Sequence, residues 1–174
     1  MRHNRRLIGD FLIIFSLTIL AYIYYPYLNS YLLPAKGINN SSYYIQIPKI
    51  KAQSDIINNV DPWDKKIYEK ALEKGVAKAK GFDNFIFAHS SLPPWKMTRT
   101  NTPFLRLGEL QKGDQIIIHQ DGKDFIYKVE YKKEVWPNEV SLVFENNKDY
   151  LILQTCTPLG TDWKRLLVFA KLTN

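Results

Sequence analysis

Hydrophobic residues dominate one long uncharged segment near the N-terminus and form several short runs after it. The segment from Phe11 to Leu28 carries no charged side chain, and its apolar character continues to Leu33. A helix needs roughly 20 apolar residues to cross a hydrocarbon core. We therefore predict a transmembrane anchor over residues 11–33, preceded by a basic tail over residues 1–10.

The residues that flank this run predict its orientation. Arg2, Arg5 and Arg6 precede the run, and tyrosines crowd its far end. Positive residues stay on the cytoplasmic side, and tyrosine rings favour the membrane–water interface. We expect a single-pass protein of the cell membrane with a cytoplasmic N-terminus and an extracytoplasmic domain. A cleaved signal peptide is the alternative, although no clear small-x-small cleavage site follows the run.

Beyond the predicted anchor, the pattern changes to short apolar runs separated by turn residues. Residues 34–42 are rich in Pro, Gly, Asn and Ser and predict a linker, which leaves residues 43–174 for one folded domain. Within this domain, runs of β-branched and aromatic residues predict six strands at Tyr43–Ile47, Asn84–Ala88, Gln115–His119, Lys123–Glu130, Tyr150–Thr155 and Arg165–Leu172.

Turn and cap residues complete this outline. Asp121-Gly122 lies between two of the predicted strands and indicates a two-residue hairpin. Asp61 followed by Pro62 predicts a helix start, with the helix running to about Leu72 and Gly75 beyond its end. Many short strands, one or two helices and no regular βαβ alternation predict a mostly-β barrel or sandwich.

Composition and charge narrow the function classes. The formal net charge is +7, but the lysines of the domain alternate with carboxylates, so we expect a mixed surface and no nucleic-acid partner. The chain has one cysteine, Cys156, so it can form no disulfide within itself. An unpaired thiol outside the cytoplasm is chemically vulnerable, which makes a catalytic role for it worth testing.

Three residues at predicted strand ends form a candidate catalytic group. Cys156 follows an apolar strand and can act as a nucleophile at the rim of the sheet, although most lone cysteines are simply small buried side chains. His89 also ends an apolar strand, and an imidazole can move a proton near neutral pH. Arg165 begins the strand after Cys156 and can stabilise a negatively charged oxygen, although it can also be an ordinary surface arginine.

Other candidates for chemistry are weaker. His3 belongs to the predicted cytoplasmic tail, His119 sits beside the hairpin and is expected to be solvated, and Lys164 is a flexible point charge beside Arg165. One cysteine and scattered histidines make no zinc pattern, and no glycine-rich phosphate loop is present in the sequence. We therefore expect no metal and no cofactor.

The motifs of the domain, taken in order, resemble the sortase family. The block Leu151-Ile152-Leu153-Gln154-Thr155-Cys156 is similar to the sortase Thr-Leu-x-Thr-Cys strand, and Arg165-Leu166-Leu167-Val168 is similar to the strand that follows it. Upstream, Phe85-Ile86-Phe87-Ala88-His89 resembles the strand that carries the catalytic histidine. The resemblance covers about Tyr43 to Leu172, nearly the whole predicted domain.

The resemblance implies an eight-stranded β-barrel and a two-step acyl transfer. Cys156 would attack a sorting signal similar to Leu-Pro-x-Thr-Gly on exported surface proteins, Arg165 would stabilise the oxyanion, and His89 would protonate the leaving amine. The resulting thioester would then pass to an amine of a cell-wall precursor or of a protein. Two alternatives remain at this point: a papain-like cysteine hydrolase, and a non-catalytic membrane-anchored β-domain that binds peptide.

Overall fold

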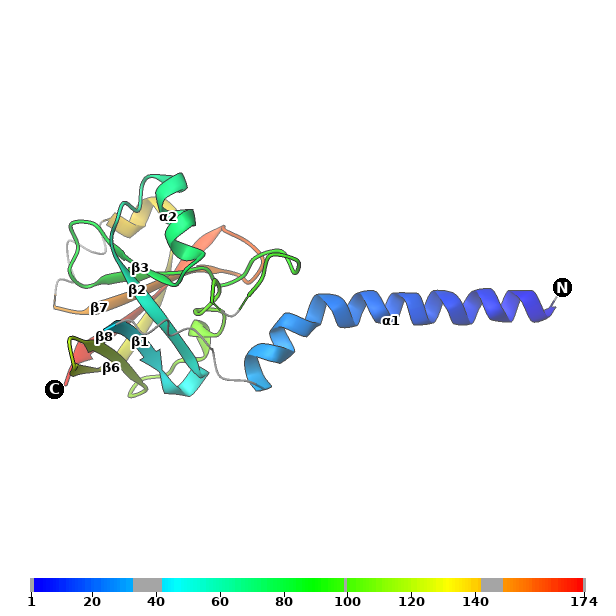
Figure 1. Cartoon of the computed structure of the whole chain (residues 1–174), viewed down its shortest axis with the longest axis horizontal. Helices are drawn as coiled ribbons and strands as arrows, with labels where there is room; N and C mark the ends of the chain where they lie inside the picture. Colours follow the sequence, from blue (N-terminus) through cyan, green and yellow to red (C-terminus); the bar gives the residue numbers. More distant parts are fainter. Residues whose placement is uncertain (1, 33–41, 99, 142–148, 174) are drawn as a thin grey trace.

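A closed barrel of eight strands follows a long N-terminal helix (Figure 1). The computed structural model describes residues 2–32, 42–98, 100–141 and 149–173. The helices are α1 (Arg2–Leu32) and α2 (Lys65–Leu72). The strands are β1 (Tyr43–Ile47), β2 (Ala52–Val60), β3 (Val76–Ala79), β4 (Phe85–Phe87), β5 (Gln115–Gln120), β6 (Lys123–Val135), β7 (Leu151–Thr157) and β8 (Lys164–Leu172). The predicted mostly-β, eight-stranded barrel is therefore confirmed.

Helix α1 leaves the barrel as an extended arm (Figure 1). Its segment Arg6–Tyr25 is long and apolar enough to cross a membrane, and none of it is buried against the barrel. The helix begins at Arg2, so the basic tail and the apolar run form one continuous element. Residues 34–41 of the predicted linker lie outside the described residues.

The barrel closes in the order β1-β2-β3-β4-β7-β8-β6-β5. Two neighbouring pairs are parallel, β2 with β3 and β4 with β7, and the other pairs are antiparallel. Its interior is filled by fully buried apolar side chains, among them Ile45, Ile116, Leu153, Leu167 and Phe169. Because all eight strands share this core, the barrel wall is a rigid support for residues at its rim.

The structure confirms the hairpin and extends the strand after it. Asp121 and Gly122 both have positive φ, 51° and 77°, as a type I′ turn between two strands requires. Strand β6 continues beyond the predicted Glu130 to Val135. Strands β2 and β3 were not among the six strands predicted from the sequence.

The predicted start of α2 is wrong by one turn. The helix begins at Lys65, and its N-cap is Asp64, whose carboxylate accepts hydrogen bonds from the backbone N–H groups of Lys66 (2.9 Å) and Ile67 (3.2 Å). Asp61 instead accepts from the N–H of Trp63 in a local turn before the helix. Both aspartates can satisfy backbone donors, which is why the sequence did not distinguish them.

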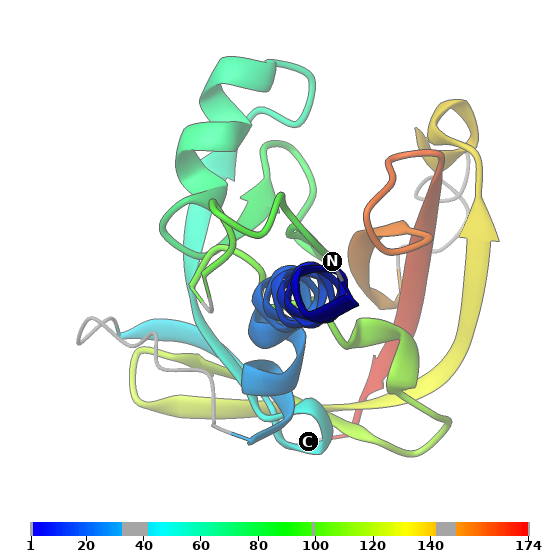
Figure 2. The same cartoon turned by 90° about the vertical axis from the view of Figure 1, so that its right-hand side faces the viewer.

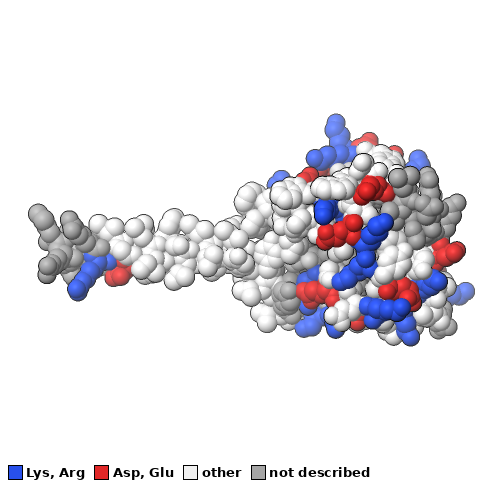
Figure 3. Space-filling model, turned by 180° about the vertical axis from the view of Figure 1, so that it is seen from behind, with Lys and Arg blue, Asp and Glu red and all other residues white. Residues whose placement is uncertain are grey.

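Charged side chains of both signs lie on the outer surface of the barrel. Figure 3 shows lysines and arginines interspersed with aspartates and glutamates on the face that it displays. Ion pairs of this mixed surface include Lys65 with Glu69 and Lys112 with Glu130. The long apolar part of α1 is almost free of charge in the same view.

Gly75 follows α2 because the chain passes very close to β2 at this point. A Cβ atom at Gly75 would overlap the backbone carbonyl oxygen of Asp55. The glycine therefore permits a close backbone approach, in addition to the role beyond the helix end that the sequence suggested.

We expect Gly75→Ala to destabilise the barrel by about 1–3 kcal/mol, because the backbone of β2 must move to relieve the overlap. Gly108→Ala is the matched control, since its new Cβ would meet Leu166 Cδ2 at an ordinary 3.6 Å. Urea unfolding in detergent, followed by tryptophan fluorescence, measures both changes. Equal unfolding midpoints for the two variants would show that the close approach of Gly75 to the backbone of β2 does not require a glycine.

Candidate active site

The parallel pairing of β4 with β7 places His89 opposite Cys156. In this pair Phe85 lies beside Ile152 and Phe87 beside Gln154. Ala88 and Thr155 continue the same offset of 67 residues through a hydrogen bond between the two segments. One residue further, this register brings His89 level with Cys156 at the carboxyl ends of the two strands.

The antiparallel pairing of β7 with β8 adds Arg165 to the same row. Cys156 and Arg165 are direct partners in the ladder, next to Thr157 and Lys164. Neighbouring strands lie roughly 4.8 Å apart, and side chains that lie level on them point to the same face. His89, Cys156 and Arg165 therefore form one row across three adjacent segments of the barrel rim.

Two hydrogen bonds hold the start of the His89 loop against β7. The backbone N–H of Ala88 donates to the carbonyl of Gln154 (3.1 Å), and the hydroxyl of Thr155 donates to the carbonyl of Ala88 (2.9 Å). Thr155 is 3% exposed, so its hydroxyl is bonded in a place that water does not reach. These bonds fix the backbone immediately before His89 relative to the backbone immediately before Cys156.

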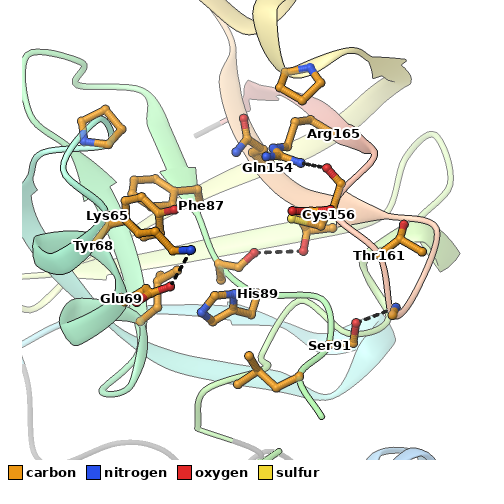
Figure 4. A pocket seen from close by; sticks show the side chains of 18 of the residues that line it. Lys65, Tyr68, Glu69, Phe87, His89, Ser91, Gln154, Cys156, Thr161 and Arg165 are labelled. Atoms are coloured by element: carbon orange, nitrogen blue, oxygen red, sulfur yellow. Dashed lines mark hydrogen bonds and ion pairs between the residues drawn. The ribbon is translucent and has the colours of Figure 1, made fainter.

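The three residues line one large cavity of about 750 Å³. Figure 4 shows His89 on one side of this cavity and Cys156, Gln154 and Arg165 on the other. Helix α2, strands β4, β7 and β8 and the loop after His89 form its walls. A cavity of this size can hold several residues of an extended peptide.

Burial and charge oppose each other at the Cys156 thiol. Burial raises its pKa, the nearby Arg165 guanidinium lowers it, and Asp162 raises it. Burial is the largest of these effects, so the pKa of Cys156 lies above its ordinary value and the resting group is a neutral thiol. A bound substrate or a proton acceptor must favour the thiolate before the sulfur can attack.

His89 is also neutral at rest. Burial lowers its pKa, and the carboxylate of Glu69 on α2 partly counteracts this by raising it. A neutral imidazole can accept a proton from a thiol at the same rim. Within the described residues, no hydrogen bond joins His89 to Cys156.

Arg165 is held in place by carbonyl groups of its own loop. Its Nη1 donates to the carbonyl of Asp162 (2.7 Å) and to that of Lys164 (3.2 Å). Nε and Nη2 make no hydrogen bond within the described part of the chain and remain able to donate. Lys164 is directed elsewhere, 3.8 Å from the carboxylate of Glu134 and over the ring of Trp136.

His119 differs from the sequence expectation. Its side chain is only 19% exposed, stacks on Tyr44, and contacts the carboxylate of Asp124 and the amide oxygen of Gln46. The expected solvated histidine is therefore wrong, because β1 lies beside β5 at this point and covers the ring. No cluster of three His, Cys, Asp or Glu side chains that could hold a metal ion is found among the described residues.

The cavity also includes residues that the sequence analysis missed. Gln154 lies two positions before Cys156 on β7, so strand alternation places both on the same face, and this signal was available in the sequence. Glu69 and Tyr68 come from α2, and Ser91 comes from the loop after His89. The hydroxyl of Ser91 accepts a hydrogen bond from the N–H of Gly160 (2.7 Å), which ties the two loops at the rim together.

Comparisons with known proteins point to one protein family. The sortase domain matches residues 45–173 of the chain. Sortase D of Bacillus subtilis (strain 168) is 32% identical over 131 residues, which cover 73% of this chain and 61% of that protein. Sortase A of Bacillus anthracis is 26% identical over 128 residues, which cover 74% of this chain and 58% of that protein. The chain thus spans about three fifths of the length of these curated relatives.

A solved structure shares the architecture. The X-ray structure of Clostridium perfringens sortase C with the C-terminal cell wall sorting motif superposes with a TM-score of 0.58 at 27% identity, covering 82% of this chain and 74% of that one. These relatives carry the A, C and D designations, so the comparisons identify the family and leave its subdivision open. The match over nearly the whole barrel shows that the chain belongs to the sortase family.

Proposed function

We propose that this chain is a membrane-anchored cysteine transpeptidase that acts on a sorting signal similar to Leu-Pro-x-Thr-Gly. The observation that carries the proposal is the row of His89, Cys156 and Arg165 at one cavity. Family membership supports a transpeptidase role in general, and the sortase C solved with its sorting motif supports a peptide as the substrate.

In the first step Cys156 attacks the carbonyl carbon of the threonine in the signal. His89 accepts the thiol proton, the Sγ–C bond forms, and the carbonyl oxygen becomes negatively charged. Arg165 lies next to Cys156 in the ladder and donates to this oxyanion through nitrogens that the loop carbonyls do not use.

The intermediate then collapses to a thioester. The C–N bond to the following residue of the signal breaks, and the imidazolium of His89 returns its proton to the leaving amine. An amine of a cell-wall precursor or of a protein attacks the thioester in the second step and releases the Cys156 thiol. The cavity around the row accommodates the signal, because its walls combine apolar and polar side chains over the length of a short peptide.

The location proposed for this chemistry is the outer side of the cell membrane. Helix α1 contains one segment able to cross a membrane, and Arg6 stands at its start. By the positive-inside rule the N-terminus lies in the cytoplasm and residues 43–174 form the extracytoplasmic catalytic domain. This arrangement holds the enzyme where exported surface proteins emerge.

The two alternatives fit the molecule less well. A papain-like hydrolase places its cysteine near a helix start, whereas Cys156 lies within strand β7. A non-catalytic peptide-binding domain does not require a thiol, an imidazole and a guanidinium in one row. The transpeptidase is therefore the function that we put forward.

Incubation of the full chain in detergent with a signal peptide should produce a thioester on Cys156, visible as a mass increase by mass spectrometry. Cys156→Ala should remove both the adduct and all cleavage, because no other cysteine is present in the sequence. A cleavage rate that survives in this variant would remove Cys156 from the mechanism.

Arg165→Ala should lower kcat/KM by about 10²–10³-fold, as expected for the loss of an oxyanion donor. Lys164→Ala is the matched control, because Lys164 contacts Glu134 and Trp136 and should leave the rate within about twofold. Steady-state kinetics on the same peptide measures both. Similar losses in the two variants would point to general surface charge rather than to Arg165.

The pH profile of kcat/KM should be bell-shaped. The one-proton state of the Cys156–His89 pair dominates between the two pKa values, and burial moves the pKa of His89 down and that of Cys156 up. The acid limb should therefore lie below about pH 6.5 and the alkaline limb above about pH 8.5, the ordinary values of the two groups. A profile narrower than this interval would contradict burial as the dominant effect.

A further inference from the structure

Two loops at one end of the barrel form a single surface. The first is residues 91–98, which follow His89, and the second is residues 158–163, which join β7 to β8. The N–H of Gly160 donates a hydrogen bond to the hydroxyl of Ser91 (2.7 Å), so the two loops lie side by side. We call these two segments the rim loops.

Large apolar side chains of the rim loops face the solvent. Trp95 is 72% exposed, Trp163 is 68% exposed and Leu159 is 52% exposed. The rim loops contain two charged side chains, Lys96 and Asp162, and these carry opposite charges. An exposed apolar patch that is rimmed by polar residues is typical of a surface that binds another protein or a membrane.

The first rim loop holds Trp95 on an ordered turn. The backbone N–H groups of Lys96 and Met97 donate to the carbonyl of Pro93, at 2.8 and 3.1 Å. The side-chain amide of Asn101 donates to the carbonyl of Lys96 (2.8 Å) and closes the turn from its other side. Because these bonds already order the loop, little conformational entropy is lost when Trp95 contacts a partner.

Helix α1 passes directly beside the rim loops. Ile23 belongs to the segment Arg6–Tyr25, which can cross a membrane, and it lines the large cavity together with Trp95. Tyr27 lines the same cavity and also lines a smaller one together with Leu159. An α-helix rises 1.5 Å per residue, so Tyr27 lies only about 3 Å beyond the end of that segment. The rim loops are therefore level with the point where α1 would leave a membrane.

The overall shape of the molecule agrees with these contacts. In Figure 1 the first rim loop, drawn in green, extends from the barrel on the side where α1 leaves, whereas α2 lies farther from that side. Figure 2 looks along α1 and shows the green and orange rim loops beside the helix. On the face displayed in Figure 3, the part of the barrel next to α1 carries few charged side chains.

We propose that the rim loops rest on the outer surface of the lipid bilayer, with Trp95 and Trp163 among the lipid headgroups. This contact rests on the membrane location proposed for α1 and is independent of the transpeptidase chemistry. Tryptophan favours the membrane–water interface because its ring is large and apolar while its N–H can donate a hydrogen bond. Lipid is the partner that fits best, because α1 brings the bilayer to the level of these loops.

The contact would also set the position of the large cavity. Trp95 of the first rim loop and Gly160 of the second both line that cavity, as does Cys156. Rim loops that lie on the bilayer therefore bring the mouth of the cavity to the membrane surface. The barrel is then held at two places, by α1 and by the rim loops, and cannot turn freely about the linker.

Tryptophan fluorescence tests the contact, because the four tryptophans of the chain, Trp63, Trp95, Trp136 and Trp163, all lie outside α1. The full chain is reconstituted into phosphatidylcholine vesicles whose acyl chains either carry bromine or do not. Bromine on a lipid quenches only those tryptophans that lie against the lipid. Two of the four tryptophans belong to the rim loops, so bromine should lower the emission by about half.

Paired substitutions then locate the tryptophans that contact lipid. Trp95→Phe combined with Trp163→Phe should abolish the quenching by bromine. The matched control is Trp63→Phe combined with Trp136→Phe, which also removes two exposed tryptophans but leaves the rim loops unchanged. In the control, bromine should quench nearly all of the remaining emission. Equal fractional quenching in the two double variants would overturn the assignment of the contact to the rim loops.

Salt and lipid charge test whether the contact is apolar. The charges of Lys96 and Asp162 cancel, so the rim loops have no net attraction to anionic lipid. Quenching should therefore be the same when phosphatidylglycerol is added to the vesicles, and the same in about 1 M salt, which screens charges beyond a few ångströms. Loss of quenching in salt would overturn the apolar contact and assign the binding to charged side chains.

Flotation of the vesicles through a density gradient shows separately whether the chain is inserted. A chain that floats with the vesicles but is not quenched by bromine would overturn the lipid contact and leave the rim loops free for a protein partner. A chain that does not float would overturn the membrane location proposed for α1, and the lipid contact with it. The thioester on Cys156 is measured on the same samples, so a failure of the transpeptidase chemistry is distinguished from both.

Discussion

The register between the parallel strands β4 and β7 is the constraint on which the candidate active site depends. The pairing places Phe87 beside Gln154. The hydrogen bond between Thr155 and Ala88 continues the same register by one residue, so that His89 comes to lie beside Cys156. A slip of one residue would turn one of the two side chains to the other face of the sheet. Figure 2, which looks along α1 toward the barrel, shows this rim facing the side from which the helix leaves. The buried core of the barrel is therefore what holds the proposed chemistry in place.

The same burial that fixes the geometry also sets the resting charges. Burial raises the pKa of Cys156 and lowers that of His89, so the neutral thiol and the neutral imidazole are the resting forms. The Arg165 guanidinium has the opposite effect on Cys156 and lowers its pKa. A neutral thiol reacts more slowly with oxidants and binds metal ions less readily than a thiolate does, so the resting form protects Cys156. In the proposed mechanism the thiolate appears when a substrate lies in the cavity beside Cys156.

Local signals in the sequence predicted much of the fold, and long-range contacts account for most of what it missed. The hairpin at Asp121-Gly122, the strand before Cys156 and the apolar N-terminal helix each follow from neighbouring residues. The covering of His119 by β1 and the close approach at Gly75 depend on segments far apart in the chain. The start of α2 was missed for a local reason, because Asp61 and Asp64 can both satisfy backbone donors. Cys156, His89 and Arg165 were proposed from the sequence because each stands at a strand end, and the structure places all three at one cavity; Glu69 on α2 lines the same cavity but gave no local signal.

The pKa of the single cysteine tests the central claim most directly, because it needs no substrate and reports on the row itself. The rate of alkylation of Cys156 by iodoacetamide, measured across pH in the folded full chain, gives this value. We expect a reactive thiol with a pKa above its ordinary value, and a further rise of this pKa in Arg165→Ala because the cation that favours the thiolate is gone. A thiol that reacts only after unfolding, or a pKa that does not respond to the loss of Arg165, would contradict the account.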